Sequence, residues 1–366
     1  MIASSPLPFS IKATFALLCG LSVIVILYLG KTILIPLVYA VIFAILLNPF
    51  VELLTRHKFN RTLAILLAVL LTIIVIGCIL FLISTQVSLF ADAYPKLRHK
   101  ISMRLLQLIS WISENINVKT DDINNWINEK RDSMVNNIGG AIGTTLGTLS
   151  NILLMLILIP VYIIMILYYT PLLAEFIRKL FHVEHHERVF DVISKSKLII
   201  QSYLLGLMLE MVIIATLNSI GLICLGIDYA IILGIIGALV NVIPLIGGYL
   251  SIIPPLIIAF ITKDSAIYAM LVIIVYAVIQ SIDDHFIIPY IVASRVKINA
   301  LISLIVVFIG GALWGIPGMF ISIPVTAIIK VIFDNIEGLK PWGFLLGNTV
   351  PSKPKGISLF KKKKIK

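Results

Sequence analysis

The sequence predicts an all-α integral membrane protein with about eight membrane-embedded helical segments, two broken or re-entrant hairpins among them, and a helical extracytoplasmic arm. Of the 366 residues, 60% are hydrophobic and only 13% are charged, whereas soluble domains are about 45–50% apolar and about 25% charged. The mean hydropathy is +1.08. The apolar residues also fall in uninterrupted blocks of the length, about 20 residues, that a helix needs to cross the hydrocarbon layer.

The formal charge of +11 raises the question of nucleic-acid binding, because basic stripes bind phosphates. The basic residues gather instead at the ends of apolar blocks and in the tail, where they orient membrane helices. We therefore expect membrane lipid, and no nucleic acid, as a partner. The sequence shows no P-loop, no nucleophile elbow and no zinc-protease motif, so we expect no enzyme activity, cofactor or metal.

The N-terminal segment, residues 1–84, predicts three spans over about 13–30, 33–51 and 62–84. The turn Arg56–Arg61 between the second and third spans is densely basic. Short cationic loops stay in the cytoplasm, and two spans separate this turn from the N-terminus. We therefore expect a multi-pass membrane protein with both termini in the cytoplasm.

The next segment, residues 85–148, is amphipathic and too polar to span, which predicts the extracytoplasmic arm. A fourth span is predicted over 149–170, closed by Pro171. Residues 171–197 carry several basic side chains and predict cytoplasmic interfacial helices. A fifth span follows at about 198–226.

Residues 198–335 predict a transport bundle, and 336–366 a basic cytoplasmic tail. Proline and glycine interrupt two apolar regions of the bundle, 229–262 and 300–335, on either side of an ordinary span at 265–282. Each region should break near its middle. Two re-entrant hairpins of opposite orientation would form an inverted repeat, which points to a transport site; two merely kinked spans are an equally good interpretation.

Unwound backbone at membrane depth exposes polar groups, and this is tolerated only inside protein or beside a wet cavity. Glycine lets a solute approach the backbone, and neutral amides suit hydroxyl-rich solutes, although helix–helix hydrogen bonding would also explain the amides. The candidate substrate-binding residues are Asn241, Pro244, Gly247, Gly248, Gln280, Asn299, Gly310, Gly311, Gly315 and Gly318.

Three carboxylates are candidates for ion or proton coupling. Glu210 is the one acid deep in a predicted span, and intramembrane acids are costly and often functional. Asp283 and Asp284 are adjacent at the end of the span 265–282, where they could bind a cation or exchange a proton. A structural hydrogen bond for Glu210 and a solvated helix end for the pair are the alternatives.

These motifs resemble those of a known family. Asn241-Val-Ile-Pro-Leu-Ile-Gly-Gly248, Asp284-His-Phe-Ile-Ile-Pro289, the segment Gly310–Gly318 and Pro324 are similar to the AI-2E, or PerM-type permease, family. The resemblance implies an inner-membrane transporter and a homo-oligomer, with a pentamer among the assemblies it allows. Some members are associated with export of autoinducer-2, others with sodium or lithium/proton antiport. Gly248 and Ala300 depart from the family pattern, where many relatives have proline.

The residues and the resemblance together leave three functions open. The first is export of a small polar organic solute, similar to autoinducer-2, through a site at the broken helices. The second is Na+(Li+)/H+ antiport by the intramembrane carboxylates. The third is a membrane scaffold that does not transport and binds a partner through the arm, residues 85–148.

Overall fold

The computed structural model describes residues 8–82, 84–85, 103, 157–244, 246–263, 265, 267–293, 296 and 298–348. Within these residues every extended regular element is a helix, and six helices are long and apolar enough to cross a membrane. The all-α membrane fold is therefore confirmed. The predicted extracytoplasmic arm, apart from residues 85 and 103, and the lysine-rich end of the tail lie outside the described residues.

The N-terminal part contains a helix at each of the three predicted spans, of which the second and third are long and apolar enough to cross a membrane. They are α1 (Phe9–Leu29), α2 (Lys31–Arg56) and a helix over Arg61–Leu82. α2 and the Arg61–Leu82 helix share an apolar cluster with the helix Ile157–Leu180, built around alanines that are nearly or wholly inaccessible to solvent. Small side chains let membrane helices approach closely, where dispersion and hydrogen bonds hold them together.

Side chains of other helices replace the backbone hydrogen bonds that two prolines remove. Pro49 inside α2 cannot donate to the carbonyl of Ile45 four residues earlier, and the Gln201 amide donates to that oxygen at 2.7 Å. Pro171 likewise leaves the carbonyl of Leu167 free, and the Arg61 guanidinium donates to it at 3.1 Å. The prediction that Pro171 closes the fourth span is wrong for this reason, since the helix continues to Leu180.

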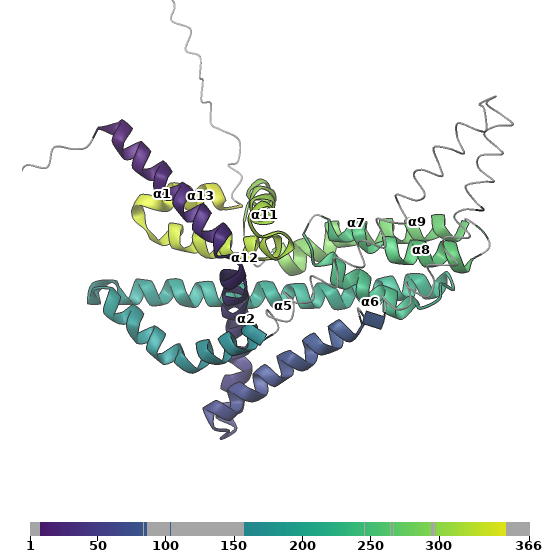
Figure 1. The fold of residues 1–366 in the computed structure, drawn as a ribbon, viewed down its shortest axis with the longest axis horizontal. Helices are drawn as coiled ribbons and strands as arrows, with labels where there is room; N and C mark the ends of the chain where they lie inside the picture. The colour runs from purple at the N-terminus through teal and green to yellow at the C-terminus, as the bar shows by residue number, and fades with distance from the viewer. Residues whose placement is uncertain are drawn as a thin grey trace, which may run out of the picture.

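The longest element is α5 (His186–Cys224), which begins after the short 3-10 turn η1 (Val183–His185). Its 39 residues make a rod of about 60 Å at 1.5 Å per residue. The helix begins at His186, well before the predicted start of the fifth span at about residue 198. α5 runs across the whole fold in Figure 1, with α11–α13 over its N-terminal half and α6–α9 beside its C-terminal half.

The region 229–262 is broken, as predicted. It forms α6 (Ala230–Asn241), α7 (Gly247–Ser251) and α8 (Ile253–Thr262). The chain turns tightly after α6 and brings Gly247 against the backbone of Asn241. A Cβ added at Gly247 would collide with that backbone. Only glycine allows two backbones to come so close.

α9 (Ile267–Ile282) does not end at the two aspartates. It continues as the wide helix η2 (Asp283–Ala293), whose hydrogen bonds have π-helical spacing. The helix therefore extends beyond the predicted span 265–282, and the two helices together form one apolar segment, Ile267–Val292. A π-helical segment is rare and frequently lies at a functional site.

The region 300–335 breaks at Gly315, between α11 (Ala300–Trp314) and α12 (Ile316–Asn335). Gly315 has φ +67° and ψ −146°, which only glycine adopts readily. The two helices then lie against each other, with the backbones of Gly310 and Gly318 in contact. Both regions are therefore broken helices; their placement relative to the bilayer stays a prediction.

The first part of the predicted tail is folded. The turn η3 (Glu337–Leu339) and helix α13 (Lys340–Leu346) lie against α12. The backbone amide of Asn299 donates to the carbonyl of Leu346 at 3.0 Å, which ties α13 to the start of α11.

Candidate functional site

Two of the predicted residues meet in a buried contact between α6 and η2. Asp283 is fully buried, with 0% exposure. The amide Nδ2 of Asn241, the last residue of α6, donates to its Oδ2 at 2.9 Å. The other carboxylate oxygen, Oδ1, has no hydrogen-bond partner among the described residues. The break after α6 therefore brings the Asn241 amide onto the intramembrane carboxylate.

Glu210 of α5 is also buried, at 6% exposure. It lies within electrostatic range of Asp283 and Asp284. None of the ion pairs in the described part of the chain includes any of these three acids. A carboxylate in low dielectric is costly without a partner, so such a site favours binding of a proton or a cation.

The next contact joins α7 to α9. Gln280 Nε2 donates to Asp284 Oδ1 at 3.0 Å, and Asp284 itself is exposed. Gly248 lies directly against the Gln280 amide, so that a Cβ at this position would overlap it. Pro244 lies in the turn before α7. The first broken region and the α9–η2 helix thus form one polar site, which we call the carboxylate site (Glu210, Asn241, Gln280, Asp283 and Asp284).

A second buried polar cluster lies beside it and was not predicted. Asn218 of α5 and Tyr276 of α9 are 1% and 5% exposed. A Cβ added at Gly237 of α6 would lie 3.1 Å from Asn218 Nδ2 and 3.2 Å from the Tyr276 hydroxyl oxygen. Asn218 follows Glu210 by eight residues, which places both on one face of a helix; this spacing was the available signal.

The remaining predicted residues lie elsewhere. Asn299 caps α11, its Oδ1 accepting from the Leu301 amide at 2.9 Å. The corner at Gly315 is fixed by a contact with α1, because the neighbouring Trp314 Nε1 donates to the carbonyl of Leu27 at 2.9 Å. Close packing of α11 on α12 accounts for Gly310, Gly311 and Gly318. The two broken regions contact different parts of α5, so the structure does not bring all the predicted residues together.

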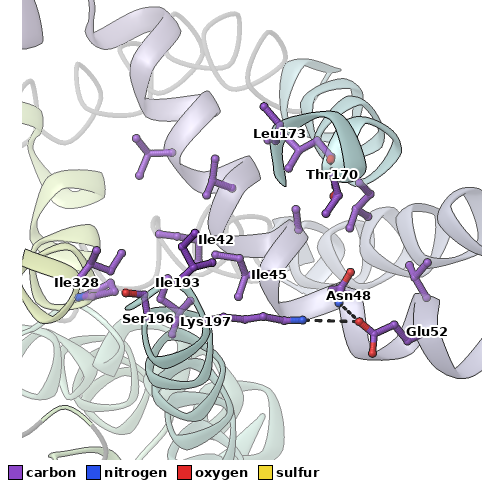
Figure 2. A pocket seen from close by; sticks show the side chains of 18 of the residues that line it. Ile42, Ile45, Asn48, Glu52, Thr170, Leu173, Ile193, Ser196, Lys197 and Ile328 are labelled. Atoms are coloured by element: carbon purple, nitrogen blue, oxygen red, sulfur yellow. Dashed lines mark hydrogen bonds and ion pairs between the residues drawn. The ribbon is translucent and has the colours of Figure 1, made fainter. Parts of the chain in front are cut away.

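A large groove lies among α2, α5, α12 and the Ile157–Leu180 helix, apart from the carboxylate site (Figure 2). Its volume is about 1040 Å³ and aliphatic side chains form most of its wall. Figure 2 shows its polar end, where Asn48 and Lys197 both contact Glu52; the Lys197 Nζ to Glu52 Oε1 distance is 3.7 Å. An apolar wall of this kind suits a lipid chain better than a polar solute.

The buried carboxylates can therefore bind and release a proton between α5, α6 and α9. Within the described residues, no three or more His, Cys, Asp or Glu side chains are positioned to hold a metal ion. Protonation of Asp283 would neutralise that carboxylate and leave its bond to Asn241 in place, because the other oxygen, Oδ1, can carry the proton.

Comparison with known proteins agrees with a transport role. The model of a family described as AI-2E family transporter matches residues 17–338. The putative transport protein YueF of Bacillus subtilis is 28% identical over 324 residues, 84% of this chain and 85% of the relative. The AI-2 transport protein TqsA of Escherichia coli is 25% identical over 91% of this chain and 92% of its own length. A sodium-lithium/proton antiporter of Halobacillus andaensis is 27% identical over 90% and 97%.

Proposed function

Since this chain belongs to the AI-2E family of transporters, we propose that it is an ion-coupled secondary transporter that exports a small polar organic solute through the buried polar site between α5, α6, α7 and α9. Asp283 is the residue that takes up the coupling ion. The protein itself crosses the bacterial inner membrane several times, with both termini in the cytoplasm, and several copies of the chain assemble into a homo-oligomer.

One observation carries this proposal: Asp283 is fully buried with one oxygen bonded to Asn241 and the other without a partner among the described residues. An ionised carboxylate in such a place is unstable, whereas the protonated acid is not. Binding and release of a proton therefore changes the energy of this conformation. A transporter needs such a change to couple two solutes.

The broken helix supports the second half of the proposal. Asn241 ends α6, and the chain turns through Pro244 before α7. Movement of this turn would separate the Asn241 amide from Asp283 without breaking a continuous helix. We infer that loss of the proton from Asp283 and rearrangement of the α6–α7 turn occur together.

Sodium–proton or lithium–proton antiport is the second candidate function. It is favoured by the cluster of three acids, Glu210, Asp283 and Asp284, within electrostatic range of one another, and by the similarity to the Halobacillus antiporter. The two candidates share the carboxylate site and differ in whether an alkali cation or an organic solute moves against the proton.

The test is proton movement in liposomes that contain the purified protein and an internal pH-sensitive dye. Gradients of sodium, lithium and autoinducer-2 are imposed in turn. We expect Asp283→Asn to abolish the pH change that a transported gradient produces. Asp228→Asn is the matched control, because Asp228 is exposed, lies in the turn between α5 and α6 outside the carboxylate site, and its variant should retain most of the rate.

The outcomes separate the candidates. A pH change with sodium or lithium alone supports antiport, and a change with autoinducer-2 alone supports solute export. Equal rates for Asp283→Asn and the unmodified protein would overturn the assignment of Asp283. Correct insertion of each variant is checked by its thermal unfolding in detergent.

A further inference from the structure

We propose that Asn218 and Tyr276 form a second, uncharged subsite of the transport path, which binds a hydroxyl group of a neutral solute. This subsite, which we call the Asn218–Tyr276 subsite, rests on the proposed transport function and deepens it. It adds a binding position and a chemical class of solute to the carboxylate site.

The first argument is that both side chains are buried without the partners that burial requires. Asn218 is 1% exposed and Tyr276 is 5% exposed; within the described part of the chain, neither Asn218 Oδ1 nor the Tyr276 hydroxyl has a hydrogen-bond partner. A buried polar atom without a partner destabilises the folded state, because it has lost its hydrogen bonds to water. The Asn218 amide, through its Nδ2, and the Tyr276 hydroxyl face the same glycine, Gly237, and each group has an atom without a partner, which indicates a position that another molecule completes.

The second argument is that this subsite lines up with the carboxylate site. On α6, Gly237 faces Asn218 and Tyr276, and Asn241, one turn later, bonds Asp283. On α9 and η2, Tyr276 comes seven residues before Asp283, so both lie on one face. α5 and η2 run in opposite directions here, since Gly206 contacts the backbone of Ile291 while Gly221 contacts Val275.

Two levels of polar groups therefore follow one another between the same three helices. One level holds a carboxylate and the other is neutral. The same three helices and η2 also supply the buried apolar cluster of Ile214, Ala238, Ile279 and Ile287. Polar side chains that follow one another inside a membrane protein commonly mark the pathway of an ion or a polar solute.

The third argument concerns the chemistry of the two groups. Asn218 Oδ1 accepts a hydrogen bond, and a tyrosine hydroxyl both donates and accepts. A solute hydroxyl would donate to Asn218 Oδ1 and accept from Tyr276. Neither group carries charge, so an ionic solute would gain little here, and the subsite selects neutral hydroxylated molecules.

The last argument is how the subsite opens. Gly237 is the α6 residue that separates the two side chains, and any larger residue would occupy the space they share. Ser251 of α7 borders the same place, its Cβ 3.7 Å from a Cβ added at Gly237. The unwound turn between α6 and α7 allows the two helices to separate, which would admit a solute.

Thiol labelling tests the proposal even while the transported solute is unidentified. The native cysteines, Cys19, Cys78 and Cys224, are exposed and are first replaced by serine. Asn218→Cys and Tyr276→Cys are then labelled in liposomes with a charged, water-soluble methanethiosulfonate. Leu222→Cys is the matched control, because Leu222 is 0% exposed, lies one turn beyond Asn218 and belongs to the same apolar cluster as Tyr276, but carries no polar group.

We expect the reagent to modify the thiols at 218 and 276 and to leave the thiol at 222 unmodified. Neutral polyols from glycerol to sorbitol should slow the reaction at 218, while sodium chloride at equal osmolarity should not. If no polyol slows labelling, the assignment of a hydroxyl subsite is wrong.

The result for Glu210→Cys separates this proposal from the proposed function. If Glu210→Cys is labelled and the thiols at 218 and 276 are not, the Asn218–Tyr276 subsite is refuted and the carboxylate site stands. If none of the three is labelled, the path between α5, α6 and α9 is refuted altogether. The second variant, at 276, guards against misfolding of the first.

Discussion

Replacement of Gly315 by alanine tests the corner of the α11–α12 hairpin in isolation. Gly315 has φ +67° and ψ −146°, a backbone region that is essentially restricted to glycine and costs other residues about 1–3 kcal/mol. A Cβ at this position would meet no atom within 4 Å. The cost is therefore backbone strain alone, with no contribution from a steric clash.

A loss of this size should be measurable by thermal unfolding in detergent. At roughly 2 °C per kcal/mol for a large chain, Gly315→Ala should lower the Tm by about 2–6 °C. The matched control is Gly338→Ala, because a Cβ there also meets no atom within 4 Å and its φ is not positive. Its Tm should stay within about 1 °C of the unmodified protein.

Two results would refute the reasoning. If Gly315→Ala unfolds at the temperature of the unmodified protein, the corner does not have this conformation. If Gly338→Ala loses as much stability as Gly315→Ala, the loss reflects glycine replacement in general and says nothing of the hairpin.

Two further predictions concern contacts between helices. Gln201→Leu leaves the Ile45 carbonyl without its hydrogen bond and should lower the free energy of unfolding by about 1–2 kcal/mol. Adding Pro49→Ala to this variant restores a backbone donor and should recover most of the loss in thermal unfolding. Equal losses in the single and double variants would contradict the role of Gln201. Gly248→Ala should push the Gln280 amide aside and reduce proton movement in the liposome assay more than it reduces Tm, and an unchanged rate would show that this contact is not needed for transport.

The long apolar helices could largely be predicted because hydrophobic length is a local property of the chain. About 20 apolar residues in succession can only be helical in a bilayer, so α2 and the helix Arg61–Leu82 were found from composition. The breaks near Pro244 and Gly315 were also found, because each residue acts on its own backbone.

The helix ends that were placed wrongly depend on distant residues. The helix passes through Pro171 because Arg61, more than 100 positions earlier, bonds the vacated carbonyl. The α9–η2 helix passes through Asp283 with Asn241 bonded to one oxygen of that carboxylate. No local rule contains either partner, so the sequence pattern ended both helices too early.

The candidate site was likewise predicted only in part. The intramembrane acids Glu210 and Asp283 were evident in the sequence, since a charge in an apolar run is conspicuous in any window. Their relation to Asn241, and the presence of Asn218 and Tyr276 beside them, depended on how α5, α6 and α9 pack.

The opening prediction, an all-α membrane protein with broken hairpins, was thus determined by the sequence itself through hydrophobic length and backbone chemistry. Which polar groups share a site was decided only by tertiary structure. The physical reason is that a hydrogen bond acts over about 3 Å, whereas its two partners can stand anywhere along the chain.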